Sequence, residues 1–146
     1  MSVEENKAIV RRFVEEVQSQ HDLDIVGELM DTNMIDHYYD AQGLQQPKNA
    51  VEGFKKFFSG MLAAFPDIKA VIHKQVAEGD NVVTHKTLHG THKGEFRGIP
   101  PTGKKVSVDV IDIFRIADGK MVEHWTVIDW MGLLQQLGAI TPPGQT

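Results

Sequence analysis

The sequence predicts an α+β fold, with helices first and an antiparallel sheet after them. Up to Pro66 the apolar residues recur at helical spacing, and beyond it they alternate with polar residues as in half-buried strands. Clusters of Gly, Asp and Pro separate the alternating segments, which is typical of antiparallel connections. This order favours packing of the helices against one face of the sheet. The 146 residues suit one domain with a sizeable core.

Two helices are expected before residue 31. Ser2 and Glu5 form a capping-box pattern, in which each side chain bonds the backbone of the other residue. The apolar stripe that follows consists of Ile9, Val10, Phe13, Val14 and Val17. Asp24 is expected to cap a short second helix. The apolar residues of that helix are Ile25, Val26, Leu29 and Met30.

A third, longer helix is expected between two prolines. Pro47 suits a first helical turn because its nitrogen carries no hydrogen, and Pro66 cannot continue a helix. The apolar residues of this helix are Val51, Phe54, Phe57, Phe58, Met61, Leu62 and Phe65.

Four strands and a last helix follow. The alternating segments are residues 68–77, 81–93, 104–116 and 120–128. Asp129 is expected to cap the last helix and Gly138 to end it. Residues 139–146 are interpreted as a loose tail.

The third alternating segment places one carboxylate, Asp112, in an otherwise apolar face. The residue opposite Asp112 depends on the turn that follows. A two-residue loop at 118–119 pairs Asp112 with Trp125, whereas a three-residue loop at 117–119 pairs it with His124. We favour the three-residue loop, because it leaves a single acid–imidazole pair on an apolar face.

Asp112 and His124 have the residue types of a proton-transfer pair. Opposed side chains on neighbouring strands have Cβ atoms roughly 5 Å apart, which permits a hydrogen bond. Burial disfavours each charge and each charge favours the other, so the pair can accept or deliver a proton near neutral pH. Alternatively, the pair is a structural contact that holds the hairpin in register.

The other polar candidates are histidines and a tyrosine-rich stretch. His85 and His89 share one face of a predicted strand, and that face either lines a cavity or meets water. Four strand residues span about 13 Å, so no zinc site is expected from the run of His85, His89 and His92 alone. Asp36 and His37, within MIDHYYD, suit either the mouth of a pocket or an ordinary loop.

Composition excludes several classes of protein. The net charge of −5 argues against a nucleic-acid partner, and no apolar stretch approaches the length of a membrane span. The absence of cysteine excludes disulfides and thiolate metal sites. The N-terminal residues lack the apolar segment of a secretory signal, so a cytoplasmic location is expected. No phosphate-binding glycine loop is present, and neither a cofactor nor a metal is expected.

The chain resembles the SnoaL-like polyketide cyclases and the related ester cyclases in its order of elements and in two stretches of sequence. These stretches are GTHKGEFRGIPPTGKKV (residues 90–106) and DIFRIADGKMVEHWTVID (residues 112–129). The resemblance covers about residues 6–138. It implies a cone-shaped α+β barrel, in which a curved antiparallel sheet and three helices enclose an apolar pocket. It also implies a homodimer, and intramolecular aldol closure without metal or cofactor, with a pocket carboxylate as general acid/base.

Carried over position by position, the acid/base aspartate of these cyclases falls at Thr126. A pocket histidine falls at Asp112, a pocket asparagine falls at Asp36, and His124 matches a histidine of the family. Threonine has no useful acidity near neutral pH. Either Asp112 takes the carboxylate role with His124 as its partner, or the pocket binds a small apolar ligand without chemistry.

We therefore expect a cofactor-independent acid/base enzyme that acts on a small hydrophobic carbonyl compound, by aldol cyclisation, isomerisation or ester cyclisation. Its predicted catalytic residues are Asp112 and His124. The predicted substrate-binding residues are Asp36, His37, Thr126 and His85. The alternative is a non-catalytic small-molecule binding protein that uses the same pocket, and a weaker one is a dimeric scaffold with a vestigial pocket.

Overall fold

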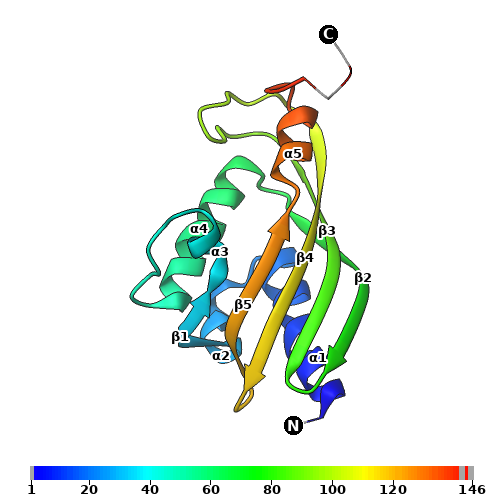
Figure 1. The fold of residues 1–146 in the computed structure, drawn as a ribbon. Helices are drawn as coiled ribbons and strands as arrows, with labels where there is room; N and C mark the ends of the chain where they lie inside the picture. Colours follow the sequence, from blue (N-terminus) through cyan, green and yellow to red (C-terminus); the bar gives the residue numbers. More distant parts are fainter. Residues whose placement is uncertain (1, 142–143, 145–146) are drawn as a thin grey trace.

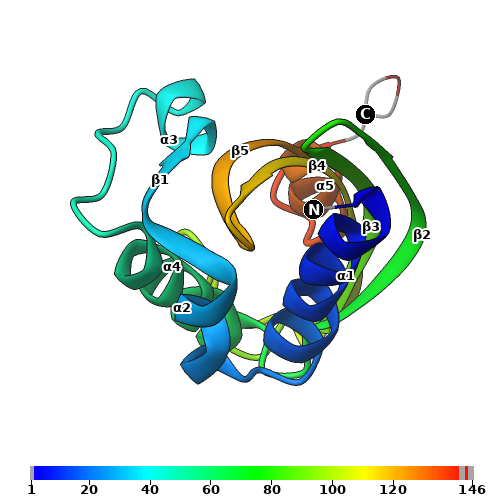
Figure 2. The same ribbon diagram turned by 90° about the horizontal axis from the view of Figure 1, so that it is seen from below.

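The computed structural model, which describes residues 2–141 and 144, is built on one curved sheet of five strands (Figure 1). The strands are β1 (Met30–Asp36), β2 (Lys69–Glu78), β3 (Asn81–Thr91), β4 (Lys105–Ala117) and β5 (Lys120–Ile128). Their order across the sheet is β1-β5-β4-β3-β2. The α+β class is confirmed, and the sheet curls without closing into a complete barrel (Figure 2).

Helices lie across the open side of the curved sheet, as Figure 2 shows for α1, α2 and α4. The helical elements are α1 (Val3–Arg12), the π-helical η1 (Phe13–Ser19), the 3₁₀ turn η2 (Leu23–Ile25), α2 (Val26–Leu29), α3 (His37–Ala41), α4 (Ala50–Ala64) and α5 (Trp130–Gln136). The capping box of Ser2 and Glu5 is confirmed at the start of α1. Asp129 caps α5, and Gly138 adopts a positive φ of 78° after it.

Two helix starts differ from the prediction. Asp22, not Asp24, accepts the capping hydrogen bond that opens η2. Helix α4 begins at Ala50 because the side chain of Asn49 accepts a hydrogen bond from the backbone of Glu52, so Pro47 precedes the helix. An Asn side chain satisfies one of the unpaired N–H groups of a first turn, which proline cannot do.

Strand β1 was not predicted, and it runs parallel to β5 in a sheet that is otherwise antiparallel. Only Met30 and Met34 of its residues are buried, and its pairing is irregular between Met30 and Ile35. A strand with so few buried positions has no period-two pattern to detect. Met30, which was expected at the end of a helix, instead begins this strand.

The β4–β5 turn is a two-residue loop followed by a bulge. Asp118 and Gly119 both have positive φ, 51° and 77°, as a type I′ turn requires. The register then shifts between Ile116 and Arg115, which leaves Val122 unpaired in the ladder. The favoured three-residue loop was therefore wrong.

The bulge decides what lies opposite the buried carboxylate. Asp112 pairs with Thr126, and His124 pairs with Phe114. The expected pairing of Asp112 with His124 differs from this register by two residues, and a shift of two keeps every side chain on its face. His124 thus stays on the face of Asp112 as a diagonal neighbour.

The core lies between the helices and the concave face of the sheet. Most of its buried side chains are aliphatic, and aromatic rings pack among them: Phe13 of η1 lies 5.0 Å from Phe54 of α4 and 5.7 Å from Phe114 of β4, measured between ring centroids. No helix among the described residues is long and apolar enough to cross a membrane. Residues 139–141 and 144 form neither helix nor strand, and the rest of the expected tail, 142–143 and 145–146, lies outside the described residues.

Candidate active site

An apolar pocket opens between the concave face of the sheet and helix α4. Aromatic and aliphatic side chains form most of its wall, among them Phe13, Met34, Phe54, Phe58 and Val108. The cavity measures about 100 Å³, enough for several water molecules or a small organic group. Against this apolar wall the few polar groups are conspicuous, because a buried polar group costs free energy unless it has a partner.

Asp112 and His124 meet on the pocket wall. Asp112 is 3% exposed, and its Oδ1 lies 2.7 Å from Nε2 of His124. The imidazole stacks on the ring of Phe114, with 4.2 Å between ring centroids and an interplanar angle of 11°. This stacking sets the plane of the imidazole and directs its two nitrogens along the wall.

Asp36 holds the other nitrogen of the imidazole. Its Oδ1 lies 3.0 Å from Nδ1 of His124, and the same oxygen accepts a hydrogen bond from the backbone of Tyr38. Asp36 is the last residue of β1 and caps α3. The parallel pairing of β1 with β5 sets Asp36 beside His124. His124 is therefore held between two carboxylates.

Lys86 is the pocket residue that the sequence analysis missed. Its Nζ lies 2.5 Å from Oδ2 of Asp112 and 2.8 Å from Oε1 of Gln18, and the residue is 1% exposed. The detectable signal is the one that identified Asp112: Lys86 is a single charge on the alternate face of its strand, between Thr84 and Leu88. We call Lys86, Asp112, His124 and Asp36 the charge network.

The charge network sets the protonation states of Asp112 and His124. Burial alone would raise the pKa of Asp112, but the ammonium of Lys86 and the imidazole of His124 lower it well below its usual range. Burial alone would lower the pKa of His124, but hydrogen bonds to Asp112 and Asp36 raise it to about 9. At neutral pH Asp112 is an anion and His124 is a cation.

Thr126 also lines the pocket, directly opposite Asp112 on the neighbouring strand. Its Oγ1 is buried and has no hydrogen-bond partner among the described residues. A buried hydroxyl without a hydrogen-bond partner destabilises the folded state, because it has given up its hydrogen bonds to water. This hydroxyl is therefore available to an oxygen atom of a ligand in the pocket.

His37 and His85 lie outside the pocket, contrary to the expectation that they bind substrate. His37 begins α3, where its Nε2 lies 2.7 Å from a carboxylate oxygen of Glu123 and its ring stacks on Trp125. The hydrogen bond with Glu123 raises the pKa of His37. His85 points to the other face of β3 from Lys86, towards Asp109. His89, four residues further along the same strand, does line the pocket, whereas His85 does not.

Known proteins resemble this chain over most of its length. The model of the family described as SnoaL-like polyketide cyclase matches residues 8–137. Nogalonic acid methyl ester cyclase from Streptomyces nogalater is 31% identical over 88 residues, which are 60% of this chain and 66%, just under two thirds, of that relative. Aklanonic acid methyl ester cyclase DauD from a Streptomyces species is 28% identical over 92% of this chain and 82% of its own length.

A solved structure gives the same result for the fold. AclR from Streptomyces galilaeus, provisionally assigned as a hydroxylase, superposes with a TM-score of 0.82 and 31% identity, covering 99% of this chain and 87% of its own. The family model spans the chain from α1 to α5, and the solved structure has the same fold. The chain belongs to the SnoaL-like polyketide cyclase family.

Proposed function

We propose that this protein is an acid/base enzyme that closes or isomerises a ring in a small hydrophobic carbonyl compound, without a cofactor. The observation that carries the proposal is the charge network on the wall of an apolar pocket. Charged groups with set positions stabilise a developing enolate better inside a dry pocket than in water. The related methyl ester cyclases support the same class of reaction.

Asp112 is poorly suited to the role of base that the sequence analysis assigned to it. Its two oxygens are engaged by His124 and Lys86, and its pKa lies well below the usual range. A carboxylate this stable has little tendency to take a proton from carbon. We assign Asp112 the role of a positioning residue, which holds the imidazolium of His124 in place.

Asp36 is the carboxylate of the charge network that has one oxygen without a partner among the described residues. Its Oδ1 contacts His124 and Tyr38, while no hydrogen bond or ion pair among the described residues engages its Oδ2. Asp36 also lines the pocket. We assign it the role of general base, because the resemblance to the cyclases places Thr126, which is not a carboxylate, at the position of the family's acid/base aspartate.

The proposed reaction begins with proton transfer from carbon to Asp36. The C–H bond next to a substrate carbonyl breaks, its electron pair moves onto the carbonyl oxygen, and the hydroxyl of Thr126 donates a hydrogen bond to the enolate. The enolate carbon then attacks a second carbonyl of the same molecule. The new C–C bond closes the ring, and the resulting alkoxide takes the proton back from Asp36.

Deuterium exchange tests this proposal before a substrate is known. Cyclic ketones, 1,3-dicarbonyls and β-keto esters are incubated with the protein in D₂O, and incorporation is followed by NMR. We expect exchange above buffer, lowered about 10²-fold or more in Asp36→Asn and by a similar factor in Thr126→Val. The matched control is Asp31→Asn, because Asp31 lies on β1 but not on the pocket wall.

The results of this experiment distinguish a wrong choice of base from a wrong proposal of enzymatic function. If Asp112→Asn stays folded and loses exchange while Asp36→Asn keeps it, the base is Asp112 and not Asp36. Absence of exchange in the wild type over the whole panel would overturn the enzyme proposal. The pocket would then be a binding site for an apolar molecule. The engagement of both oxygens of Asp112 by His124 and Lys86 supports this alternative.

We also propose that two copies associate through the outer face of the sheet. Large apolar side chains are exposed there: Val71 and Val76 on β2, Ile111 on β4 and Val127 on β5, the last 74% exposed. Exposed apolar groups on one face of a sheet are typical of an interface. Sedimentation of the wild type should give a dimer and Val127→Lys a monomer; a wild type that sediments as a monomer would contradict this.

A further inference from the structure

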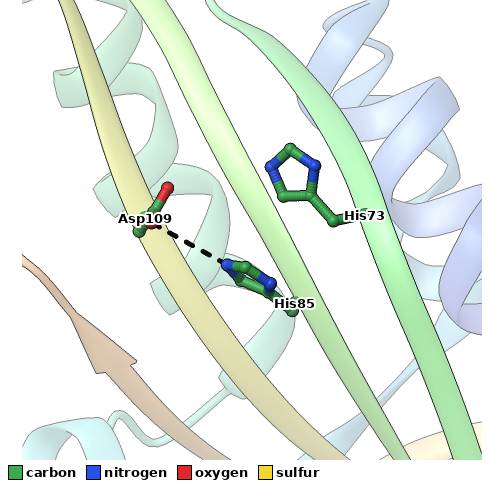
Figure 3. Close-up of side chains that lie close together, drawn as sticks. All are labelled: His73, His85 and Asp109. Atoms are coloured by element: carbon green, nitrogen blue, oxygen red, sulfur yellow. Dashed lines mark ion pairs between the residues drawn. The ribbon is translucent and has the colours of Figure 1, made fainter.

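A cluster of side chains that can bind metal lies on the outer face of the sheet (Figure 3), and none of its residues lines the pocket. It consists of His73 on β2, His85 on β3 and Asp109 on β4. One potential ligand atom from each residue lies within 4.8 Å of the others. The neighbouring inward residues, Lys86 and Val110, point to the core, so this cluster is separate from the charge network.

The sheet itself brings these three residues together. Thr87 pairs with Asp109, which makes Asp109 a diagonal neighbour of His85. On β2 the register shifts between Ile72 and Lys74, so His73 occupies a bulge next to His85. A bulge re-aims a side chain, and bulges are common at sheet edges, where β2 lies, and next to active sites. Three adjacent strands thus each supply one ligand.

The present distances require only small side-chain movements to enclose an ion. Nε2 of His85 lies 3.8 Å from Oδ2 of Asp109, and the rings of His73 and His85 are 4.9 Å apart between centroids. Ligand bonds of about 2.0–2.2 Å in a tetrahedral site put neighbouring ligand atoms about 3.4 Å apart. Rotation about side-chain torsions of exposed residues can close the remaining gaps without moving the strands.

Thr87 contacts two of the three residues of the cluster. Its hydroxyl donates a hydrogen bond of 2.7 Å to Oδ1 of Asp109, and Nε2 of His73 lies 2.6 Å from the same hydroxyl. Such outer contacts orient ligands in known metal sites.

We propose that His73, His85 and Asp109 bind a divalent transition-metal ion of the zinc class. Two imidazoles and one carboxylate suit Zn²⁺, Co²⁺ or Ni²⁺, whereas Mg²⁺ and Ca²⁺ prefer oxygen ligands. Three protein ligands leave a coordination position for water. The ion would join β2, β3 and β4. It would lie next to the charge network along the chain, because Lys86 stands between His85 and Thr87.

Calorimetric titration of the full, untagged chain with Zn²⁺ at pH 7 tests the site. We expect one ion per chain and at least a tenfold loss of affinity in each of His73→Ala and His85→Ala. Thr87→Val, which removes only the supporting hydroxyl, is expected to weaken binding about 10- to 100-fold. His89→Ala is the matched control, because His89 lies on the same strand about 13 Å from His85 and is expected to leave the affinity unchanged.

Further measurements exclude misfolding of a variant, or the association of two copies, as the cause of a change in zinc affinity. Co²⁺ should give the visible absorption of a tetrahedral site in the wild type but not in His73→Ala, and zinc should raise the melting temperature of the wild type alone. The titration is repeated with Val127→Lys, in which the site should persist. No zinc binding by the wild type, or equal binding by folded His73→Ala and His85→Ala, would overturn the proposal.

Discussion

Replacing Lys86 by methionine should be among the most destabilising changes in this protein. Lys86 is 1% exposed and its ammonium lies 2.5 Å from the carboxylate of Asp112, which is itself 3% exposed. Methionine keeps most of the side-chain volume but removes the charge. Asp112 is then left with one cationic partner, His124, which it shares with Asp36.

Two arguments give the size of the effect. Unit charges about 4 Å apart attract by about 4 kcal/mol at the effective dielectric constant of a protein site. Removing one partner of a buried ion pair costs about 3–5 kcal/mol in measured cases. We therefore expect Lys86→Met to lower the free energy of unfolding by about 3–5 kcal/mol, equivalent to about 6–20 °C in melting temperature.

Urea unfolding of three variants provides the assay. Lys86→Met/Asp112→Asn removes both charges and should be more stable than Lys86→Met alone, because no uncompensated carboxylate is left buried. Lys55→Met is the control for an exposed pair, since Lys55 lies 3.9 Å from a partner, Glu52, whose side chain is 69% exposed, and the change should have little effect. A loss below about 1 kcal/mol in Lys86→Met would refute the reasoning.

Three other predictions follow from the structure. The folded pKa of His124, about 9, exceeds its unfolded value near 6.5, so its stabilisation is complete below about pH 6.5 and is lost as pH rises through 9. Urea unfolding should show a fall of a few kcal/mol between pH 6.5 and 9.5 in the wild type and a much smaller one in His124→Gln; equal falls would contradict the raised pKa. Asn49→Ala removes the cap of α4 and should cost about 1 kcal/mol in thermal unfolding, so an unchanged melting temperature would exclude the cap as a stabilising contact. Gly119→Ala places a Cβ at φ 77° in the β4–β5 turn and should cost about 1 kcal/mol, whereas Gly60→Ala, inside α4 with open space around it, should be neutral or stabilising.

Much of the fold was predictable because its signals are local. The capping box at Ser2 and the cap at Asp129 depend on residues three positions away. The four strands after residue 68 were found within a few residues of their observed ends because apolar and polar residues alternate along the sequence there, most regularly in β4. The presence of Asp112 and His124 on the pocket face follows from the same alternation and from family resemblance.

The candidate site was less predictable, because it depends on pairing between distant segments. Asp36 reaches His124 only through the parallel pairing of β1 with β5, and β1 has no periodic pattern. Lys86 carries a detectable signal, as a single charge between Thr84 and Leu88 on one face of its strand, but its partner Asp112 lies on another strand. His85 was placed in the pocket although its position in the strand, next to an inward Lys86, puts it on the outer face.

By itself the sequence determined the α+β class, the order of helices and strands, and the face on which Asp112 lies. These properties follow from periodicity and from caps, which involve neighbours in the chain. Only the tertiary structure decided that Asp112 faces Thr126, that Lys86 neutralises it, and that His73 meets His85. The physical reason is that these contacts depend on the register between strands. Bulges at His73 and Val122 set that register for β2–β3 and β4–β5, whereas the regular β3–β4 pairing places Lys86 beside Asp112. A bulge shifts every contact beyond it and leaves the local pattern unchanged.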